Sequence, residues 1–269
     1  MLIMELFNIP HDIQNVLIHT DVLRGIKFPM KNRSSFLESH HEFLIEFTQE
    51  KPLFFPGFNY TCLKTGKYSV KNDEVQVGVL NERIRGKNLY NRDLTPVFNF
   101  LSNSKEDYTL VENNDTIDPF GFNSTFDFLF NNNSYLLHYG SSFNTSTIIH
   151  YIERISGKLS YRYDKQFSIE IVDDQTIKNV RFNYHVRPLN YNLVYDWIKL
   201  ETDLKSDNLL NEYKNGRTQI LGVKINDLVK YWLDKLNEDP LYLLDQTTKY
   251  NVSKKLDELG GKFELKHFE

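Results

Sequence analysis

The sequence has a single cysteine, Cys62, so it holds neither a disulfide framework nor a cysteine metal cluster. It also lacks a run of about 18 apolar residues and a basic amino-terminal segment leading into an apolar core, which argues against a membrane span and a secretory signal. The formal net charge of −4 provides no excess of positive charge for nucleic acid or an anionic membrane. Neither a dinucleotide fingerprint nor a P-loop occurs. We therefore expect a cytoplasmic protein that uses no metal.

Aromatic side chains are plentiful, with 20 Phe and 16 Tyr among 269 residues, and 40% of the chain is hydrophobic. This composition can bury a sizeable core, and the length suits one large domain or two closely packed lobes. No internal repeat or flexible linker divides the chain. We predict one domain over residues 1–269, with a first lobe at 1–160 that carries the site and a β-rich second lobe at 161–269 that ends in helices.

Hydrophobic spacing predicts the secondary structure along most of the chain. Short buried strands are predicted at 16–22, 52–58 and 134–140, and helices at 34–49, 77–85, 124–129, 225–239 and, in part, 251–259. The segments FSIEIV, NVRFNYHVR and NLVYDWIKL have alternating apolar positions, which are typical of strands. The polar stretch at 203–215 is predicted to be a loop or a short helix.

The stretch from residue 134 to 156 has the sequence features of a binding crevice. A buried strand, SYLLHYG, leads into a turn of small residues, and STIIHYIERIS then forms a helix. In such a unit the free backbone N–H groups at the helix start can face an anionic group. The residues that we expect to bind a ligand or cap the helix here are Ser141, Ser142, Asn144 and Thr145.

His150 and Glu153 lie three residues apart in this helix, so their side chains share a face. A carboxylate within hydrogen-bond distance of one imidazole nitrogen fixes the tautomer and raises the basicity of the other nitrogen. Such an imidazole suits a general base that takes a proton from an attacking amine or alcohol. The spacing also fits a His–Glu pair that only decorates the helix surface.

Two other groups of residues invite a chemical interpretation. Ser141 or Ser142 would be the nucleophile of a serine hydrolase, yet the Gly-x-Ser-x-Gly pattern of a nucleophile elbow is absent. His40 and His41 are adjacent on a predicted helix and diverge in direction. No further Cys or His stands at ligand spacing, so we expect solvated histidines rather than metal ligands.

Residues 118–153 carry the most specific pattern of the chain. Asp-Pro-Phe-Gly begins at Asp118, a helix and a strand ending at Gly140 follow, and Asn-Thr-Ser-Thr-Ile-Ile-His-Tyr-Ile-Glu runs from Asn144 to Glu153. This order resembles the aminoglycoside 3-N-acetyltransferase family, which has Asp-Pro-x-Gly, a strand ending in a small-residue turn, and Asn-Thr-Thr-Leu-His-x-x-Glu. Weaker similarity extends over about residues 16–236, including IHTDVLRG at 18–25 and VGVL at 77–80.

The resemblance implies a two-lobed α/β fold with a mixed sheet, helices around it and a β-rich second half. It implies that acyl-CoA binds in a cleft, that His150 deprotonates the acceptor amine, and that Glu153 supports the histidine. The residues that it assigns to the coenzyme are Thr20, Asp21, Leu23 and Arg24, joined by Ser141, Ser142, Asn144 and Thr145 of the turn.

The sequence departs from the family on the acceptor side. The family has His-Pro-x-His-Ser ahead of the Asp-Pro block, whereas Thr95-Pro96-Val97-Phe98-Asn99 stands there in this chain. We assign Asp118, Thr95 and Arg154 to acceptor binding. Basic residues beyond the catalytic helix either meet a diphosphate or form a solvated face. They are Arg154, Lys158, Arg162, Lys165, Arg181 and Arg187.

These observations predict an acyl-CoA-dependent N-acyltransferase that acts on the primary amine of a dTDP- or UDP-linked amino-deoxy sugar for surface polysaccharide biosynthesis. Direct attack on the thioester needs no acyl-enzyme, in keeping with the position of Cys62 outside the motif. The alternatives are an aminoglycoside 3-N-acetyltransferase of antibiotic resistance, a non-catalytic binding relative and a serine hydrolase. Expected partners are an amino sugar and acetyl-CoA or another short acyl-CoA, with no nucleic acid and no membrane. A homodimer is one open alternative for the assembly.

Overall fold

The structure, a computed structural model, describes residues 6–106, 115–188 and 191–268. Within them, seven strands form the larger of two sheets. In their order across this sheet the strands are β10 (Asn211–Asn215), β11 (Thr218–Lys224), β7 (Ser134–Tyr139), β1 (Asn15–Thr20), β2 (Leu53–Pro56), β5 (Phe100–Ser102) and β4 (Asn91–Arg92). β1 runs parallel to β2 and β7, and the other pairs are antiparallel. The predicted mixed α/β fold is therefore confirmed.

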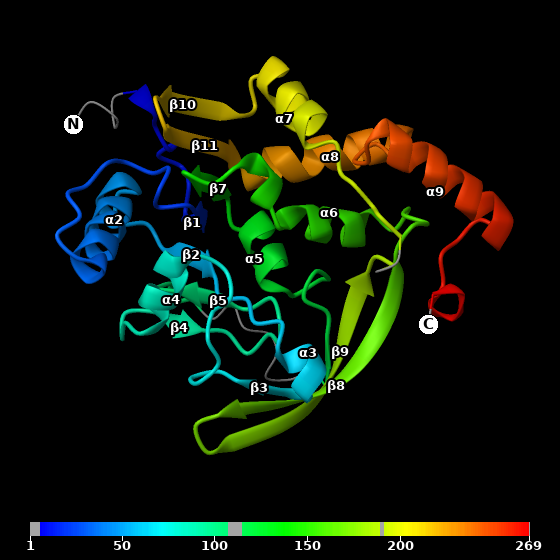
Figure 1. Cartoon of the computed structure of the whole chain (residues 1–269), viewed down its shortest axis with the longest axis horizontal. Helices are drawn as coiled ribbons and strands as arrows, with labels where there is room; N and C mark the ends of the chain where they lie inside the picture. Colours follow the sequence, from blue (N-terminus) through cyan, green and yellow to red (C-terminus); the bar gives the residue numbers. More distant parts are fainter. Residues whose placement is uncertain (1–5, 107–114, 189–190, 269) are drawn as a thin grey trace.

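The smaller sheet is built around one long hairpin. Its order is β3 (Lys67–Ser69), β8 (Tyr163–Asp173), β9 (Thr176–Val186) and β6 (Thr116–Ile117). β8 and β9 pair antiparallel over their whole length, and β3 and β6 add parallel edges from the first half of the chain. Figure 1 shows this hairpin curving away at the lower right. The predicted lobe at 161–269 thus supplies strands to both sheets, since β10 and β11 belong to the larger one.

Helices cover both faces of the larger sheet (Figure 1). Alternation along β1 decides which side chain meets which helix, because successive residues of a strand point to opposite faces. Val16 and Ile18 join the hydrophobic cluster with α2 and α4, whereas Leu17 joins the cluster with α5, α6 and α8. The helices are α2 (Arg33–Phe47), α3 (Cys62–Thr65), α4 (Val79–Arg85), α5 (Thr125–Asn131), α6 (Ile148–Ser156), α7 (Trp197–Ser206), α8 (Ile225–Glu238) and α9 (Gln246–Leu259), with short 3-10 turns η2 (Phe143–Thr145) and η3 (Leu265–His267).

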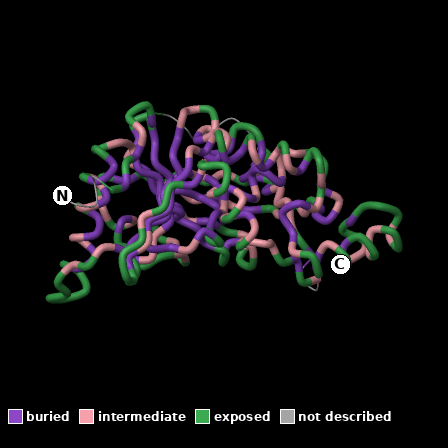
Figure 2. Tube along the Cα trace, turned by 90° about the horizontal axis from the view of Figure 1, so that it is seen from above, coloured by how far each residue is buried: buried purple, intermediate pink, exposed green. Residues whose placement is uncertain are grey.

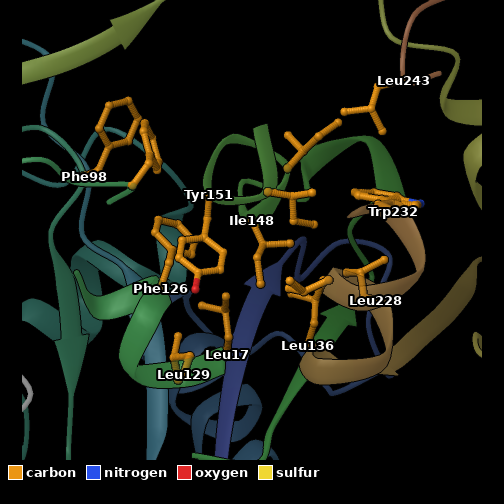
Figure 3. Packing of buried hydrophobic residues seen from close by; sticks show 14 of the residues in the cluster. Leu17, Phe98, Phe126, Leu129, Leu136, Ile148, Tyr151, Leu228, Trp232 and Leu243 are labelled. Carbon is orange, nitrogen blue, oxygen red and sulfur yellow. The ribbon is translucent and has the colours of Figure 1, made fainter. Parts of the chain in front are cut away.

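Helix α6, which carries the predicted base, is seated in the core. Its Ile148 and Tyr151 lie over Leu17 of β1 and Leu136 of β7, as Figure 3 shows, and all four side chains are buried. In Figure 2 the buried residues gather in the centre of the trace and exposed residues follow its rim. A Leu or Ile side chain buried in this way contributes about 1.5–3 kcal/mol. The core therefore fixes the position of α6 firmly.

Three local predictions are wrong. The segment at 192–200 is not a strand, because α7 begins at Trp197, where the Asp196 side chain accepts a hydrogen bond from the Lys199 backbone N–H at 3.1 Å. Residues 211–215 are neither loop nor helix, because they pair with β11 as β10.

His40 and His41 are not solvated. Both are buried, and each has a tyrosine hydroxyl next to one ring nitrogen. The Tyr139 hydroxyl lies 2.7 Å from His40 Nδ1, and the Tyr90 hydroxyl lies 2.9 Å from His41 Nε2. In the described part of the chain, no helix is long and apolar enough to cross a bilayer.

Candidate active site

The turn after β7 brings two distant segments together. Gly140 has a φ of +72°, and a Cβ atom there would lie 2.1 Å from the backbone oxygen of Asp21. Only glycine fits this close approach and this dihedral angle. The Asp21 backbone N–H also donates to the Tyr139 carbonyl at 2.8 Å. The loop after β1 and the turn before α6 therefore meet at one edge of the larger sheet.

Several residues predicted to bind the coenzyme lie at this meeting point. Arg24 Nη1 donates to Ser142 Oγ at 3.4 Å, and Asp21 Oδ1 accepts from the Leu23 backbone N–H at 3.1 Å. Leu23 is 73% exposed. Thr20 points elsewhere, since its hydroxyl donates to Asn81 Oδ1 of α4 at 3.2 Å.

Ser141 is not available as a nucleophile. It is 5% exposed, its hydroxyl donates to the His19 carbonyl at 2.9 Å, and it lies 3.0 Å from His138 Nδ1. The ring of His138 is itself fully buried and stacks on His19 with a centroid distance of 5.1 Å. Burial lowers the pKa of His19 to about 4 and that of His138 well below its ordinary value. Ser141 and these two histidines thus form a buried layer beneath the turn.

His150 lies on α6 with one nitrogen held and the other free. Its Nδ1 is 3.1 Å from Glu153 Oε2, as expected for an i, i+3 pair on one helix face. The side chain is 27% exposed, and its ring packs edge-on against Phe120 at a centroid distance of 5.3 Å. Among the described residues, none forms a hydrogen bond with Nε2. The His150 lone pair that can accept a proton therefore remains free.

The carboxylate of Glu153 is fully buried and has three hydrogen-bond partners and one ion-pair partner. Oε1 accepts from the hydroxyls of Tyr161 and Tyr195 at 3.0 Å and 2.9 Å, and Oε2 is 2.8 Å from Arg162 Nη2 and 3.1 Å from His150 Nδ1. Burial alone raises the pKa of Glu153, but the Arg162 charge and the hydrogen bonds of His150 and Tyr195 outweigh it and lower the pKa to about 2. Glu153 is therefore ionised at neutral pH.

Arg162 Nη2 lies against both members of the His150–Glu153 pair. It donates to the Tyr195 hydroxyl at 2.5 Å, forms an ion pair with Glu153 Oε2 at 2.8 Å and lies 3.2 Å from His150 Nδ1. Nδ1 therefore has a carboxylate and a guanidinium as neighbours, whereas Nε2 has no hydrogen-bond partner among the described residues. Nε2 is the ring nitrogen that stays available to a ligand.

A cavity of about 440 Å³ opens beside His150. Asn144, Thr145 and Thr147 of the turn line it, together with aromatic side chains. No carboxylate lines it among the described residues, whereas the exposed Arg187 does. Its aromatic walls are Tyr60, Phe98, Tyr184, Tyr195 and Trp197.

The residues assigned to the acceptor do not gather at this cavity. Arg154 is held by Asp118 Oδ2 at 2.6 Å and by Asp164 Oδ1 at 2.9 Å. Thr95 is buried, and its backbone N–H donates to Asp93 Oδ1 at 2.9 Å, within a loop organised by that carboxylate. Of the six basic residues considered for a diphosphate, only Arg162 and Arg187 line the cavity.

Sequence reasoning missed Tyr161 and Tyr195 and the use of Arg162. Tyr161 and Arg162 directly precede β8, and Tyr195 lies 42 residues from Glu153 in an irregular segment. No short motif joins these positions to Glu153. Only the packing of the hairpin and of the 193–196 segment against α6 brings them together.

Comparisons with known proteins show the family and the fold of the chain. A model of the aminoglycoside 3-N-acetyltransferase family matches residues 59–237, which is 179 of 269 residues. Among solved structures, aminoglycoside acetyltransferase AAC(3)-Xa has a TM-score of 0.69 at 13% identity, covering 88% of this chain and 90% of that one. AAC-IIIb in a binary complex with CoASH has a TM-score of 0.66 at 13% identity, with coverage of 84% and 90%. The YokD protein from Bacillus subtilis has a TM-score of 0.63 at 12% identity, with coverage of 84% and 88%.

No curated relative matches the chain. At such low identities the solved structures show the fold alone, whereas the family model covers most of the chain. The fold and the site thus define an acyl-CoA-dependent N-acetyltransferase. More narrowly, the chain belongs to the aminoglycoside 3-N-acetyltransferase family, as its sequence pattern predicts.

Proposed function

We propose that the protein transfers an acyl group from acyl-CoA to a primary amine of an aminoglycoside-type amino sugar, with His150 as general base. The observation that carries this proposal is the orientation of the His150 ring, whose Nδ1 is held by the buried Glu153 while Nε2 is free. An amine nucleophile must lose a proton before or during attack, and a positioned imidazole supplies this step.

The reaction needs no covalent acyl-enzyme. The amine nitrogen attacks the thioester carbonyl carbon, a C–N bond forms, and His150 Nε2 takes the proton from that nitrogen. The C–S bond then breaks, and the departing thiolate takes the proton from the imidazolium to give CoASH. Backbone N–H groups of the turn at 140–147 and of the start of α6 are our candidates for stabilising the oxyanion. Cys62 is buried in α3, and burial raises the pKa of its thiol to about 11.

For the coenzyme we retain the segments that meet at Gly140. Arg24 is exposed, and among the described side chains its guanidinium forms a hydrogen bond only with the neutral Ser142, so it can pair with a phosphate of CoA. Asn144 and Thr145 line the cavity beside His150 and suit the end of the coenzyme that carries the acyl group. Asp21 and Leu23 complete the proposed coenzyme loop, defined as residues 20–24.

The choice of acceptor rests on the family and on its similarity to AAC(3)-Xa, which is an aminoglycoside acetyltransferase. A second candidate, a nucleotide-linked amino sugar, is favoured by one feature of the cavity. Arg187 is exposed at its wall, and no described carboxylate lines it, whereas a polycationic drug benefits from acidic groups. The same Arg187 can pair with a diphosphate.

The deciding experiment measures release of CoA thiol from acetyl-CoA with kanamycin, gentamicin and a dTDP- or UDP-linked amino-deoxy sugar. Release with the drugs supports the first acceptor, and release only with the nucleotide sugar replaces it with the second. Mass spectrometry of the product identifies the acetylated nitrogen. Absence of release with every amine, from a folded protein that binds CoA, contradicts the enzymatic proposal and leaves the non-catalytic relative.

A further inference from the structure

Arg162 occupies an unusual place for an arginine, because it is almost fully buried next to the proposed base and reaches the cavity wall only at its edge. Its side chain is 3% exposed, and Nη2 donates to the Tyr195 hydroxyl, forms an ion pair with the Glu153 carboxylate and lies 3.2 Å from His150 Nδ1. Nη1 donates to the His185 carbonyl at 3.0 Å, while Nε is buried with no partner in the described part of the chain. A buried cation with an unpaired N–H is a poor device for stability alone.

The charge of Arg162 changes what Glu153 does to His150. A lone buried carboxylate next to an imidazole favours the imidazolium and makes the neutral base scarce at neutral pH. With Arg162 paired to Glu153 the two charges compensate, and the hydrogen bond to Nδ1 is kept while much of the attraction for a second proton is lost. Consistent with this, burial lowers the pKa of His150, and the charges of Arg162 and Arg187 act in the same direction, outweighing Glu153.

We propose that Arg162 is a positioning residue that compensates the charge of Glu153 and thereby keeps the His150 ring neutral and ready to accept a proton. The proposal rests on the assignment of His150 as the base. Glu153 supplies orientation, and Arg162 removes the electrostatic penalty that this orientation would otherwise impose on proton uptake.

The other ionisable groups around His150 do not replace Arg162. Tyr161 and Tyr195 are phenols whose pKa values burial raises above the ordinary range, so both are neutral. Tyr184 also lines the cavity, and burial raises its pKa. The ring of His185 is 2.9 Å from Asp164. Arg187 is exposed, and water and salt screen its effect.

The test is a direct titration of the His150 ring by NMR in the full-length protein, together with the pH profile of kcat/KM. In the wild type we expect a ring pKa below the ordinary 6.5. In Arg162→Gln it should rise by about one unit or more, since Glu153 is then uncompensated, and the acid limb of the rate profile should move upward with it. Arg162→Lys keeps the positive charge, so the acid limb of its kcat/KM profile should lie at the wild-type pH. Arg85→Gln removes another ion-paired arginine, on α4, and should leave the limb in place.

The outcomes separate this inference from the assignment of the base. A wild-type ring pKa above about 7, as an uncompensated carboxylate would cause, overturns the inference. Because this measurement uses the wild type, it tests the inference even if Arg162→Gln does not fold. An unmoved ring pKa in folded Arg162→Gln, with a rate lowered equally at every pH, overturns it too. If the ring pKa rises in the variant but the rate profile stays put, the compensation by Arg162 stands and His150 is not the base.

Discussion

The buried cluster beneath His150 and the coenzyme loop at 20–24 use charge in opposite ways. In the cluster, formed by Glu153, Arg162, Tyr161 and Tyr195, every charge is excluded from water and has a protein partner. In the loop, Arg24 is exposed and, among the described side chains, its guanidinium forms a hydrogen bond only with the Ser142 hydroxyl. Salt weakens the interaction between two buried charges only slightly. Between exposed charges in 0.1 M salt, interactions over more than about 10 Å are largely screened.

The difference teaches which substitutions act on chemistry and which on binding. A change in the buried cluster alters the proton affinity or orientation of His150, so its effect should appear in kcat and in the pH profile. A change in the loop should appear in the KM for acyl-CoA and should depend on salt.

The largest effect is expected from the base itself. His150→Asn removes the proton acceptor and should lower kcat by about 10²–10⁴-fold, with the KM for acyl-CoA largely kept. Steady-state rates by thiol release across about pH 6 to 9 provide the measurement. A near wild-type rate over that range would falsify the assignment.

The second effect is on stability and tests the buried layer beneath the turn. The folded-state pKa of His19 is about 4 against an ordinary 6.5, so between these values the unfolded chain takes up a proton that the folded protein refuses. The contribution of His19 to the free energy of unfolding is therefore fully present above pH 6.5 and is lost as the pH falls toward 4. At pH 5 the loss from this one group is about 2 kcal/mol. Urea unfolding at pH 7.5 and pH 5 measures how much the free energy of unfolding falls between the two pH values. This fall should be smaller for His19→Gln than for the wild type. The exposed His11→Gln is the control, and an equal loss in both variants contradicts the prediction.

The smallest effect is expected in the coenzyme loop. Arg24→Ala should raise the KM for acyl-CoA several-fold and spare kcat, because a guanidinium–phosphate pair is lost while the base is untouched. The difference from wild type should shrink as salt is raised from about 0.05 to 0.5 M. Lys230→Ala, which removes an exposed cation from α8, serves as control. An unchanged KM for Arg24→Ala assigns Arg24 to a structural role at Ser142.

Much of the catalytic helix could be predicted because its determinants are local. The buried strand β7, the glycine turn and the His150–Glu153 spacing all lie within about twenty residues, and strand and helix periods are visible at that range. The edge strand β10 was missed because its sequence, NEYKN, is polar and only pairing with β11 makes it a strand. Helix α7 was missed because an alternating apolar pattern competed with an N-cap at Asp196.

The environment of the carboxylate could not be predicted for a different reason. Which partners reach Glu153 depends on how the β8–β9 hairpin and the 193–196 segment pack, and neither leaves a periodic signal near Glu153 itself. For the same reason Arg162, visible in the sequence as one of six basic residues, was grouped with candidates for a diphosphate. Its burial beside Glu153 is a property of the tertiary structure.

The hairpin also imposes an order of assembly on the growing chain. The edge strands β3 and β6 end at Ser69 and Ile117, yet their partners β8 and β9 begin only at Tyr163 and Thr176. Strand pairing over such sequence separations is slow, because the entropy of closing a long loop is lost before the strand contacts can stabilise the pair. Arg162 emerges from the ribosome directly ahead of the hairpin, more than 150 residues after synthesis begins. A nascent chain that already contains His150 and Glu153 therefore still lacks Arg162, and the ion pair with Glu153 forms only after synthesis has reached the start of the hairpin.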